Sequence, residues 1–235
     1  MTTVENDNGY RTQAMYTFSE AARLAGVSAG TVRNWLFGYT RRESVNAPGG
    51  RVTQDRRVDP LFNTMPADAV MVSFLQLVEI VMAGKFRTSE GVRFEIVKRA
   101  YENAQQEFHI DHPFAHLELR ALGGEIVRLM HKGSSQSMSN LLQWTLPDLV
   151  SEAVDQLDYE HDLASRWHPV GKGVPIVVDP KVSAGVPTFE GRGITISALY
   201  WRWKHERQPM DFIASDFELT RDQVEQVLRY AERVA

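Results

Sequence analysis

The sequence predicts a mainly α-helical protein of the α+β class, in which small β-hairpins join short helical units. Two observations favour this class. Apolar residues recur at three-to-four spacing in most segments, and short alternating runs flank turns that contain Gly and Pro. The chain has 235 residues, 43% of them hydrophobic and 24% charged, which is enough for two or three small folded units. We predict four segments: a flexible polar tail (1–14), a winged helix-turn-helix with a following helical pair (15–108), a middle segment of hairpin and helices (109–168) and a C-terminal three-helix unit (169–235).

The composition excludes several classes of protein. Cysteine is absent, which excludes disulfides and cysteine-ligated zinc fingers. No apolar run reaches the roughly 18–20 residues of a membrane span, and the first residues lack the basic and apolar regions of a secretory signal. We therefore expect a cytoplasmic protein without a membrane partner. Because the formal net charge is −4, any affinity for DNA must come from a local basic patch.

A helix, a tight turn and a second helix follow the polar tail. Gly26 supplies the positive φ that ends the first helix, and Ser28 can cap the second. The second helix has an apolar face at three-to-four spacing, formed by Val32, Trp35 and Leu36. Its outer face carries donors of a kind that can enter the major groove of DNA. We predict DNA contacts from Ser28, Thr31, Arg33 and Asn34, the first two on phosphate. An ordinary helical hairpin in a core is the alternative.

A basic ribbon follows these two helices. Between Arg23 and Arg57 the sequence has seven arginines, no lysine and two acids, a local balance of +5. The stretch Asn46–Gly50 has strong turn chemistry, so the arginines on either side of it are expected to lie on paired strands. Although charge runs are often only solvated faces, this position after two helices favours a wing that grips phosphate. The predicted wing contacts are Arg41, Arg42, Arg51, Arg56 and Arg57.

The stretch YTFSEAARLAGVSAGTVRNWLFGY resembles the N-terminal DNA-binding helices of MerR-type regulators. In that family a helical pair follows the wing, and residues 72–108 are similar to it. We expect Thr88 and Ser89 to cap the second helix of this pair. The resemblance covers about residues 15–108 and implies DNA binding. The long dimerising helix and effector domain of that family are not seen, so it does not imply inducer sensing.

The middle segment carries weaker signals. Apolar and polar residues alternate around Gly123-Gly124, which predicts a β-hairpin, and residues 141–157 read as one or two amphipathic helices. His109, His112 and His116 are interpreted as structural or surface residues, because Pro113 breaks any shared helical face. The sequence has no phosphate loop, dinucleotide fingerprint or nucleophile elbow. We expect no catalytic residues, no metal and no cofactor, hence not an enzyme.

The C-terminal segment is expected to hold two short strands and three helices that begin near Ile196, Met210 and Thr220. The stretch IASDFELTRDQV and the residues before it resemble a small homeodomain-like family of antitoxin-type domains of unknown function. The match covers about residues 174–234, and Arg192 departs from the family pattern. The matching positions are Asp179, Pro180, Gly185, Pro187, Gly191, Ile213, Ala214, Asp216, Phe217, Leu219, Thr220, Val224 and Tyr230.

The combination of both units resembles VapB-type antitoxins. That resemblance implies a type II toxin–antitoxin pair with a PIN-like (VapC-type) ribonuclease toxin, and repression of the protein's own operon through operator DNA. We expect a homodimer that reads two half-sites. Arg229 and Arg233 are candidate toxin-binding residues. An acidic stretch, Asp148–Asp162, is a second candidate that could imitate RNA phosphate. The alternative functions are a stand-alone transcriptional regulator without a toxin, or an adaptor that contacts only proteins.

Overall fold

The computed structural model describes residues 9–48, 50–62, 65–66, 68–88, 93–117 and 151–234. The helices of this part are α1 (Gly9–Thr12), α2 (Phe18–Ala25), α3 (Ala29–Phe37), α4 (Phe74–Thr88), α5 (Phe94–Phe108), α8 (Ile196–Lys204), α9 (Met210–Asp216) and α10 (Arg221–Val234). Four two-stranded antiparallel sheets pair β1 (Ala14–Thr17) with β4 (Met71–Ser73), β2 (Tyr39–Ala47) with β3 (Gly50–Val58), β5 (Leu157–Glu160) with β6 (Leu163–Trp167), and β7 (Ile176–Val177) with β8 (Thr188–Phe189). The predicted fold class, mainly α with small hairpins, is confirmed.

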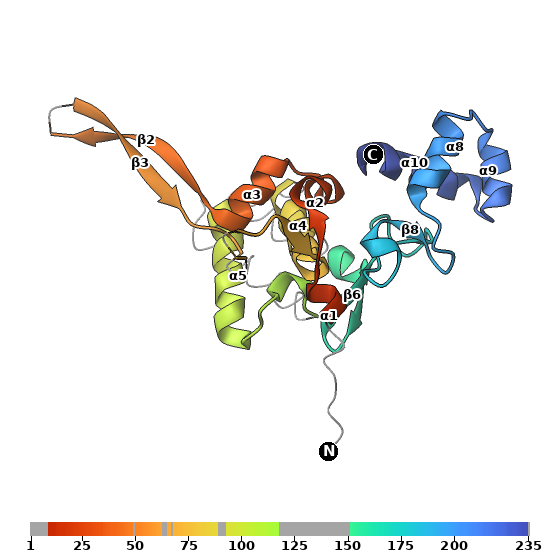
Figure 1. Ribbon diagram of the computed structural model, residues 1–235. Coiled ribbons are helices and arrows are strands. Elements are labelled where there is room, and N and C mark those ends of the chain that lie inside the picture. The colour runs from red at the N-terminus through yellow and green to blue at the C-terminus, as the bar shows by residue number, and fades with distance from the viewer. Residues whose placement is uncertain are drawn as a thin grey trace, which may run out of the picture.

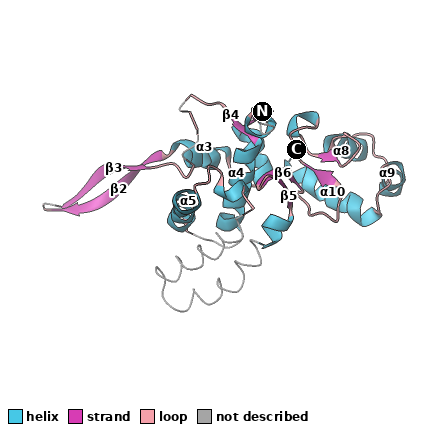
Figure 2. Cartoon of the chain, turned by 90° about the horizontal axis from the view of Figure 1, so that it is seen from below, coloured by secondary structure: helices cyan, strands magenta, loops and turns pink. Residues whose placement is uncertain are grey.

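The molecule is elongated (Figure 1). The hairpin β2–β3 projects from one end, α4 lies in the middle, and α8, α9 and α10 form the other end. A view along a perpendicular direction shows the same order (Figure 2). The two predicted binding surfaces, on α3 with the hairpin and on α10, therefore lie at separate parts of the molecule.

Helix α4 is the centre of the core. Its residues from Phe74 to Phe86 are apolar around most of the helix and almost all are buried, as expected for a helix covered on every side. Phe62, Phe86, Tyr101 and Phe114 meet beside it in edge-to-face pairs with centroids 5.2–6.4 Å apart. These rings join the chain after the hairpin to α4 and α5. In the described part, α4 included, no helix has the length and apolarity needed to cross a membrane.

The structure corrects two expectations in the N-terminal half. Residues 9–14 do not belong to a loose tail, because α1 and the start of β1 occupy them and Arg11 is 1% exposed. The Arg11 guanidinium donates to the Glu160 backbone oxygen over 2.8 Å and pairs with the Glu160 carboxylate. Thr88 and Ser89 do not cap α5, since α4 continues through Thr88 and α5 has Arg93 at its N-cap. Helix α5 therefore begins later in the chain than caps at Thr88 and Ser89 would have placed it.

The middle segment is described only in part. The hairpin expected around Gly123-Gly124 lies outside the described residues, as do residues 141–150 of the expected helices. Residues 151–155 are helical, and Leu157 begins strand β5 instead of ending a helix. His109, His112 and His116 line one depression, but among the described residues no group of three or more such side chains could hold a metal ion. His112 Nδ1 lies 3.0 Å from the buried carboxylate of Glu79 on α4. This contact gives His112 a structural role, as expected.

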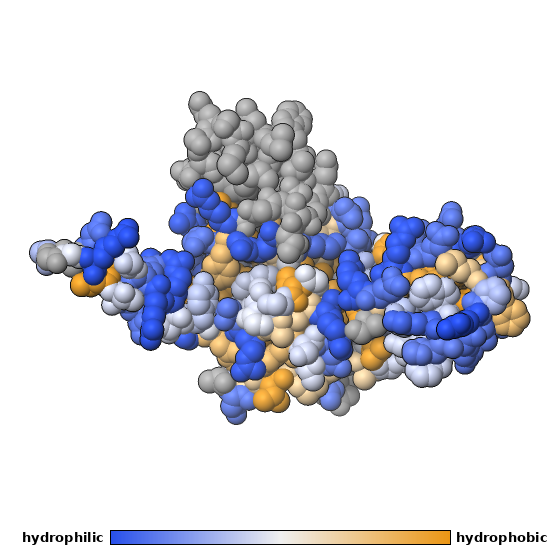
Figure 3. Space-filling model, turned by 90° about the horizontal axis from the view of Figure 1, so that it is seen from above, coloured by the Kyte–Doolittle hydropathy of each residue, from blue (hydrophilic) through white to orange (hydrophobic). Residues whose placement is uncertain are grey.

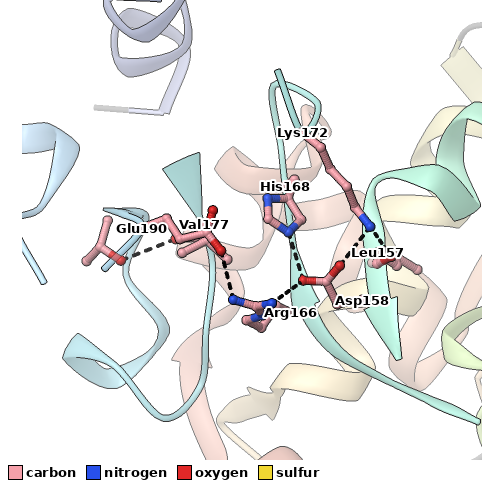
Figure 4. A network of polar contacts seen from close by, with 8 residues as sticks. Leu157, Asp158, Arg166, His168, Lys172, Val177 and Glu190 are labelled. Carbon is pink, nitrogen blue, oxygen red and sulfur yellow. Dashed lines mark hydrogen bonds and ion pairs between the residues drawn. The ribbon is translucent and has the colours of Figure 1, made fainter. Parts of the chain in front are cut away.

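A polar network centred on Asp158 joins β5–β6 to its surroundings (Figure 4). The Asp158 carboxylate lies 3.0 Å from His168 Nε2, 2.7 Å from Lys172 Nζ and 2.8 Å from an Arg166 nitrogen. Arg166 also pairs with Glu190, in the turn after β8, over 2.9 Å. Burial alone would raise the pKa of Asp158, but the hydrogen bonds from His168 and Lys172 and the nearby charges lower it to about 2. Part of the acidic stretch is thus neutralised inside the fold.

A buried contact fastens the C-terminal unit to β1, the strand that leads into α2. The Tyr16 hydroxyl, just before α2, donates to the Gly185 backbone oxygen over 3.1 Å. Gly185 has φ +72°, and a Cβ there would lie 1.9 Å from the Tyr16 oxygen. Only glycine fits, because both the backbone conformation and the space exclude a side chain.

Candidate nucleic-acid interface

Helices α2 and α3 form where the sequence predicts them, for local reasons. Thr17 and Glu20 make a complete capping box at the start of α2. Gly26 ends α2 with φ 68°, and the Ser28 hydroxyl accepts the Thr31 backbone N–H over 3.0 Å at the start of α3. Two short helices therefore pack against each other across a three-residue turn.

The outer face of α3 carries the predicted polar residues. Val32, Trp35 and Leu36 are buried against α2 and the core, as predicted, which turns Arg33 and Asn34 toward solvent. The Arg33 guanidinium lies over the Phe18 ring, 5.4 Å from its centroid. This stacking holds the side chain along the helix surface and leaves its donors available.

The hairpin β2–β3 is anchored to the C-terminal end of α3. Gly38 ends α3 with φ 68°, and a Cβ at this position would lie 2.3 Å from the Val58 oxygen. The Arg57 guanidinium donates to the Phe37 backbone oxygen over 2.5 Å. After the hairpin, the backbone N–H of Leu61 donates to the Trp35 oxygen over 2.7 Å. These contacts fix the base of the ribbon beside α3, while the rest of the ribbon extends into solvent (Figure 1).

The predicted wing arginines have different surroundings. Arg41 and Arg56 both contact the Glu43 carboxylate, and the second of these contacts is 3.5 Å long. Arg42 lies 3.5 Å from Asp55, with both side chains largely exposed. Among the described residues, Arg51 near the tip of the hairpin forms no ion pair. The structure thus brings Arg57 next to α3, places Arg51 at the far end of the ribbon, and pairs Arg41 and Arg56 with one acid.

Helix α5 adds basic residues that the sequence-based prediction did not include. A depression of about 340 Å³ lies between the base of the hairpin and α5, and its lining includes Arg41, Arg56, Lys98 and Arg99. Lys98 is partly neutralised by Glu102 over 3.7 Å. The sequence does contain a pattern that predicts this basic surface. Lys98 and Arg99 come three and four residues after Glu95, so the three must share one side of the helix.

The predicted toxin-binding residues lie in the C-terminal unit. Arg229 and Arg233 occupy successive turns of α10 and line a shallow depression of about 250 Å³ together with Pro169, Val170 and Gln226. Arg229 lies 3.6 Å from Glu225, and the Arg233 guanidinium lies 5.1 Å from the centroid of the Tyr230 ring. Both side chains are exposed. They lie in a part of the molecule separate from α3 and the hairpin (Figure 1).

Comparisons with known proteins identify similar sequences and a similar fold. Residues 176–231 match the family described as "Protein of unknown function (DUF433)". The chain is 25% identical over 228 residues to "Uncharacterized protein Rv2308" of Mycobacterium tuberculosis, with 93% of this chain and 90% of that protein covered. It is 23% identical over 230 residues to "Putative antitoxin VapB45" of the same organism, with 91% and 92% covered.

The fold is also similar to a solved structure. The crystal structure of Rv2018 from Mycobacterium tuberculosis superposes with a TM-score of 0.64, at 19% identity, over 92% of this chain and 98% of that one. This likeness concerns the fold alone. Since the superposition covers nearly the whole of both chains, the likeness extends over the N-terminal, middle and C-terminal parts and is not confined to one of them.

Proposed function

We propose that this protein is the antitoxin of a type II toxin–antitoxin pair. In this proposal it neutralises a PIN-like ribonuclease toxin, represses its own operon as a homodimer bound to operator DNA, and acts in the cytoplasm by binding and not by catalysis. The observation that carries the antitoxin role is the alignment with the protein named "Putative antitoxin VapB45" over 91% of this chain. The match of residues 176–231 to the DUF433 family agrees with the resemblance of this segment to antitoxin-type domains.

For DNA, α3 would enter the major groove and the hairpin would hold the phosphate backbone. Ser28 and Thr31 stand at the N-terminus of α3, where the backbone N–H groups attract phosphate. Arg33 and Asn34 are exposed on the outer face, and their side chains suit base edges. A single unit of this size binds weakly, so we propose a dimer that reads two half-sites.

For the toxin, Arg229 and Arg233 would contact acidic groups. The depression that they line on α10 leaves room for a partner's carboxylate between two guanidinium groups. The competing idea, that the acidic stretch 148–162 imitates RNA, has less support. Asp158 and Glu160 already bind Arg166, Lys172 and Arg11 within the fold, so their charges are committed.

The decisive experiment is affinity purification of the tagged protein from its native cell, with mass spectrometry of what is bound. We expect a small PIN-like nuclease in near-equal amount, and a double variant Arg229→Gln/Arg233→Gln that recovers much less of it. Arg221→Gln/Arg202→Gln, which removes the same charge from the same unit, serves as the matched control. Recovery of the protein alone, in a preparation that still shifts its own upstream DNA, would leave a stand-alone regulator and reject the antitoxin role.

A further inference from the structure

The hairpin β2–β3 has two faces of different chemistry. In the antiparallel register Arg41 opposes Arg56, and Arg42 opposes Asp55. Because side chains alternate across a strand, the pairs divide into two sets. One set, here the polar face, holds Thr40, Arg42, Ser44, Asn46, Arg51, Thr53, Asp55 and Arg57. The other set, here the mixed face, holds Tyr39, Arg41, Glu43, Val45, Val52, Gln54, Arg56 and Val58.

The mixed face has already neutralised much of its charge. Glu43 is only 19% exposed, because the arginines on either side, Arg41 and Arg56, cover it. The hydrogen bond from Arg41 holds the pKa of Glu43 below its ordinary value, so this carboxylate stays ionised and attractive to both arginines. Val52 on the same face is 48% exposed, and Figure 3 shows an apolar spot on the otherwise hydrophilic hairpin. A face of this composition offers little to a phosphate chain.

The polar face offers donors along its whole length. It carries three arginines against one acid, and Arg42 is 83% exposed with only a 3.5 Å contact to Asp55. Hydroxyl and amide groups fill the positions between the arginines, and such groups commonly bind phosphate oxygens. An anion with regularly spaced oxygens fits this face better than a protein surface would.

At the base of the hairpin, the two faces make different contacts with the neighbouring helices α3 and α5. On the polar face, Arg57 reaches back to the Phe37 oxygen at the end of α3. Arg41 and Arg56 of the mixed face line the depression shared with Lys98 of α5, and Arg57 of the polar face lines it as well. Through Arg57 the polar face is therefore joined to α3, the helix with the exposed Arg33 and Asn34, whereas Arg41 and Arg56 of the mixed face lie beside α5.

We propose that DNA lies along the polar face of the hairpin, with Arg42 and Arg51 on its phosphates, and that Arg41 and Arg56 are not DNA contacts but hold Glu43. This inference rests on the proposed DNA binding and sharpens it, because it separates four of the five arginines of the ribbon into two pairs with different roles. Two-stranded ribbons coil, so the polar face winds from the base of the hairpin to its tip. A surface that follows a helical phosphate chain must wind in this way.

The test compares two double variants of equal charge change. Arg42→Gln/Arg51→Gln removes two arginines of the polar face, and Arg41→Gln/Arg56→Gln removes two from the mixed face. Long-range attraction to DNA falls by a similar amount in both, so that a difference reports direct contact. Arg41→Gln/Arg56→Gln also leaves the Glu43 carboxylate uncovered. Because this charge would repel DNA, the comparison is biased against the proposal. Thermal unfolding of each variant shows that the protein is folded.

Binding is measured by fluorescence anisotropy with a labelled mixed-sequence DNA duplex of about three helical turns, between about 50 and 200 mM salt. We expect Arg42→Gln/Arg51→Gln to weaken binding on the order of 30-fold and to lower the slope of log K against log salt by about two, roughly one per lost phosphate contact. Arg41→Gln/Arg56→Gln should weaken it no more than about threefold and leave the slope nearly unchanged.

Two outcomes would overturn the assignment, and they are distinguishable. Equal losses for the two pairs, with wild-type binding intact, would reject the division of the faces and leave DNA binding standing. A wild-type protein that binds no duplex even at low salt would reject both this inference and the proposed DNA binding. Glu43→Gln adds an independent check: it frees Arg41 and Arg56, and tighter binding by more than the single removed charge explains would show that the mixed face contacts DNA.

Discussion

The molecule contains two pairs of helices joined by a tight turn, and they differ in what their arginines do. At the N-terminal pair, α2 and α3, Arg33 lies on an aromatic ring, and Arg42 and Arg51 of the adjoining hairpin are largely exposed. At the C-terminal pair, α9 and α10, arginines are bound to nearby acids: Arg221 to Asp211 over 3.0 Å and to Glu225 over 3.7 Å. The number of arginines near such a pair of helices is therefore a weaker indication of DNA binding than whether those arginines are already paired with acids.

The same difference extends to the rest of the C-terminal unit. Arg202 pairs with Asp216, and Arg192 pairs with Glu218 over 2.5 Å while donating to the Phe217 oxygen over 2.8 Å. Gln223 donates to the Gly173 oxygen over 3.0 Å. Arg192, Arg202 and Gln223 are thus occupied by contacts within the fold, which favours contact with protein over contact with DNA for this unit.

The largest expected effect comes from removing the support of the N-terminal pair. Trp35 is 4% exposed and meets the Phe62 ring edge to face at 6.5 Å. Trp35→Ala should cost about 3–5 kcal/mol of unfolding free energy and abolish DNA binding by loosening α3 and the base of the hairpin. Urea unfolding measures the first effect. The neighbouring change Asn34→Ala, on the exposed face, should alter stability by no more than about 0.5 kcal/mol while weakening DNA binding. If Trp35→Ala weakens binding at unchanged stability, Trp35 is itself a contact.

The junction between the two regions gives the next effect. Gly185→Ala introduces a Cβ that overlaps the Tyr16 hydroxyl in a backbone conformation that alanine disfavours. We expect a loss of about 2–3 kcal/mol. Gly191→Ala has a similar φ of +74° but no atom within 4 Å of the new Cβ, so it should cost only about 1 kcal/mol. Differential scanning calorimetry compares the two variants, and equal losses would mean that the Tyr16 contact contributes nothing.

The Asp158 network predicts a pH dependence at the same junction. The folded pKa of Asp158, about 2, lies below its ordinary value of 3.8, so ionised Asp158 stabilises the fold above that value and this contribution is lost as the pH falls from 3.8 toward 2. Asp158→Asn should cost about 2 kcal/mol at neutral pH. Urea unfolding over this range should show the wild type approaching the variant near pH 2. A difference that persists unchanged would assign the loss to packing instead of charge.

The smallest expected effect tests the comparison most directly. Arg221→Gln removes an exposed ion pair in the C-terminal unit, so stability should change by no more than about 0.5 kcal/mol. DNA affinity should change by less than about twofold, because this region is not expected to touch DNA. The matched single change Arg51→Gln in the hairpin should leave stability equally intact and weaken DNA binding several-fold. Parallel gel-shift titrations decide between them, and equal effects would erase the distinction drawn between the two regions.

Much of the fold was predictable because the determinants are local. The capping residue Ser28, the turn at Gly26 and the turn chemistry of Asn46–Gly50 each act within a few residues, and the structure confirms the helices and the ribbon that they predict. The order inside residues 9–14 was not predictable, because the partner that buries Arg11 is Glu160, 149 residues away. No local sequence pattern predicts an ion pair between residues so far apart in the chain.

The candidate interface was predictable in location but not in detail. The arginine run marks the hairpin, and the position of the turn also fixes which residues of the two strands oppose each other. Once Ala47 and Gly50 flank the turn, Arg41 must oppose Arg56, with Glu43 on the same face. The depth to which Glu43 is covered, which decides how much charge remains, depends on side-chain packing that no residue pattern encodes.

The hairpin has a further consequence for the protein in its free state. β2 and β3 pair only with each other in the described sheet, so each has an outer edge of unsatisfied backbone N–H and C=O groups that another extended chain could join. Long exposed edges of this kind promote assembly into larger sheets, and charged side chains along them prevent it. We therefore expect the exposed Arg42 and Arg51 to limit such assembly in the unbound protein. A variant that loses them would become prone to aggregate on concentration, in addition to losing a partner.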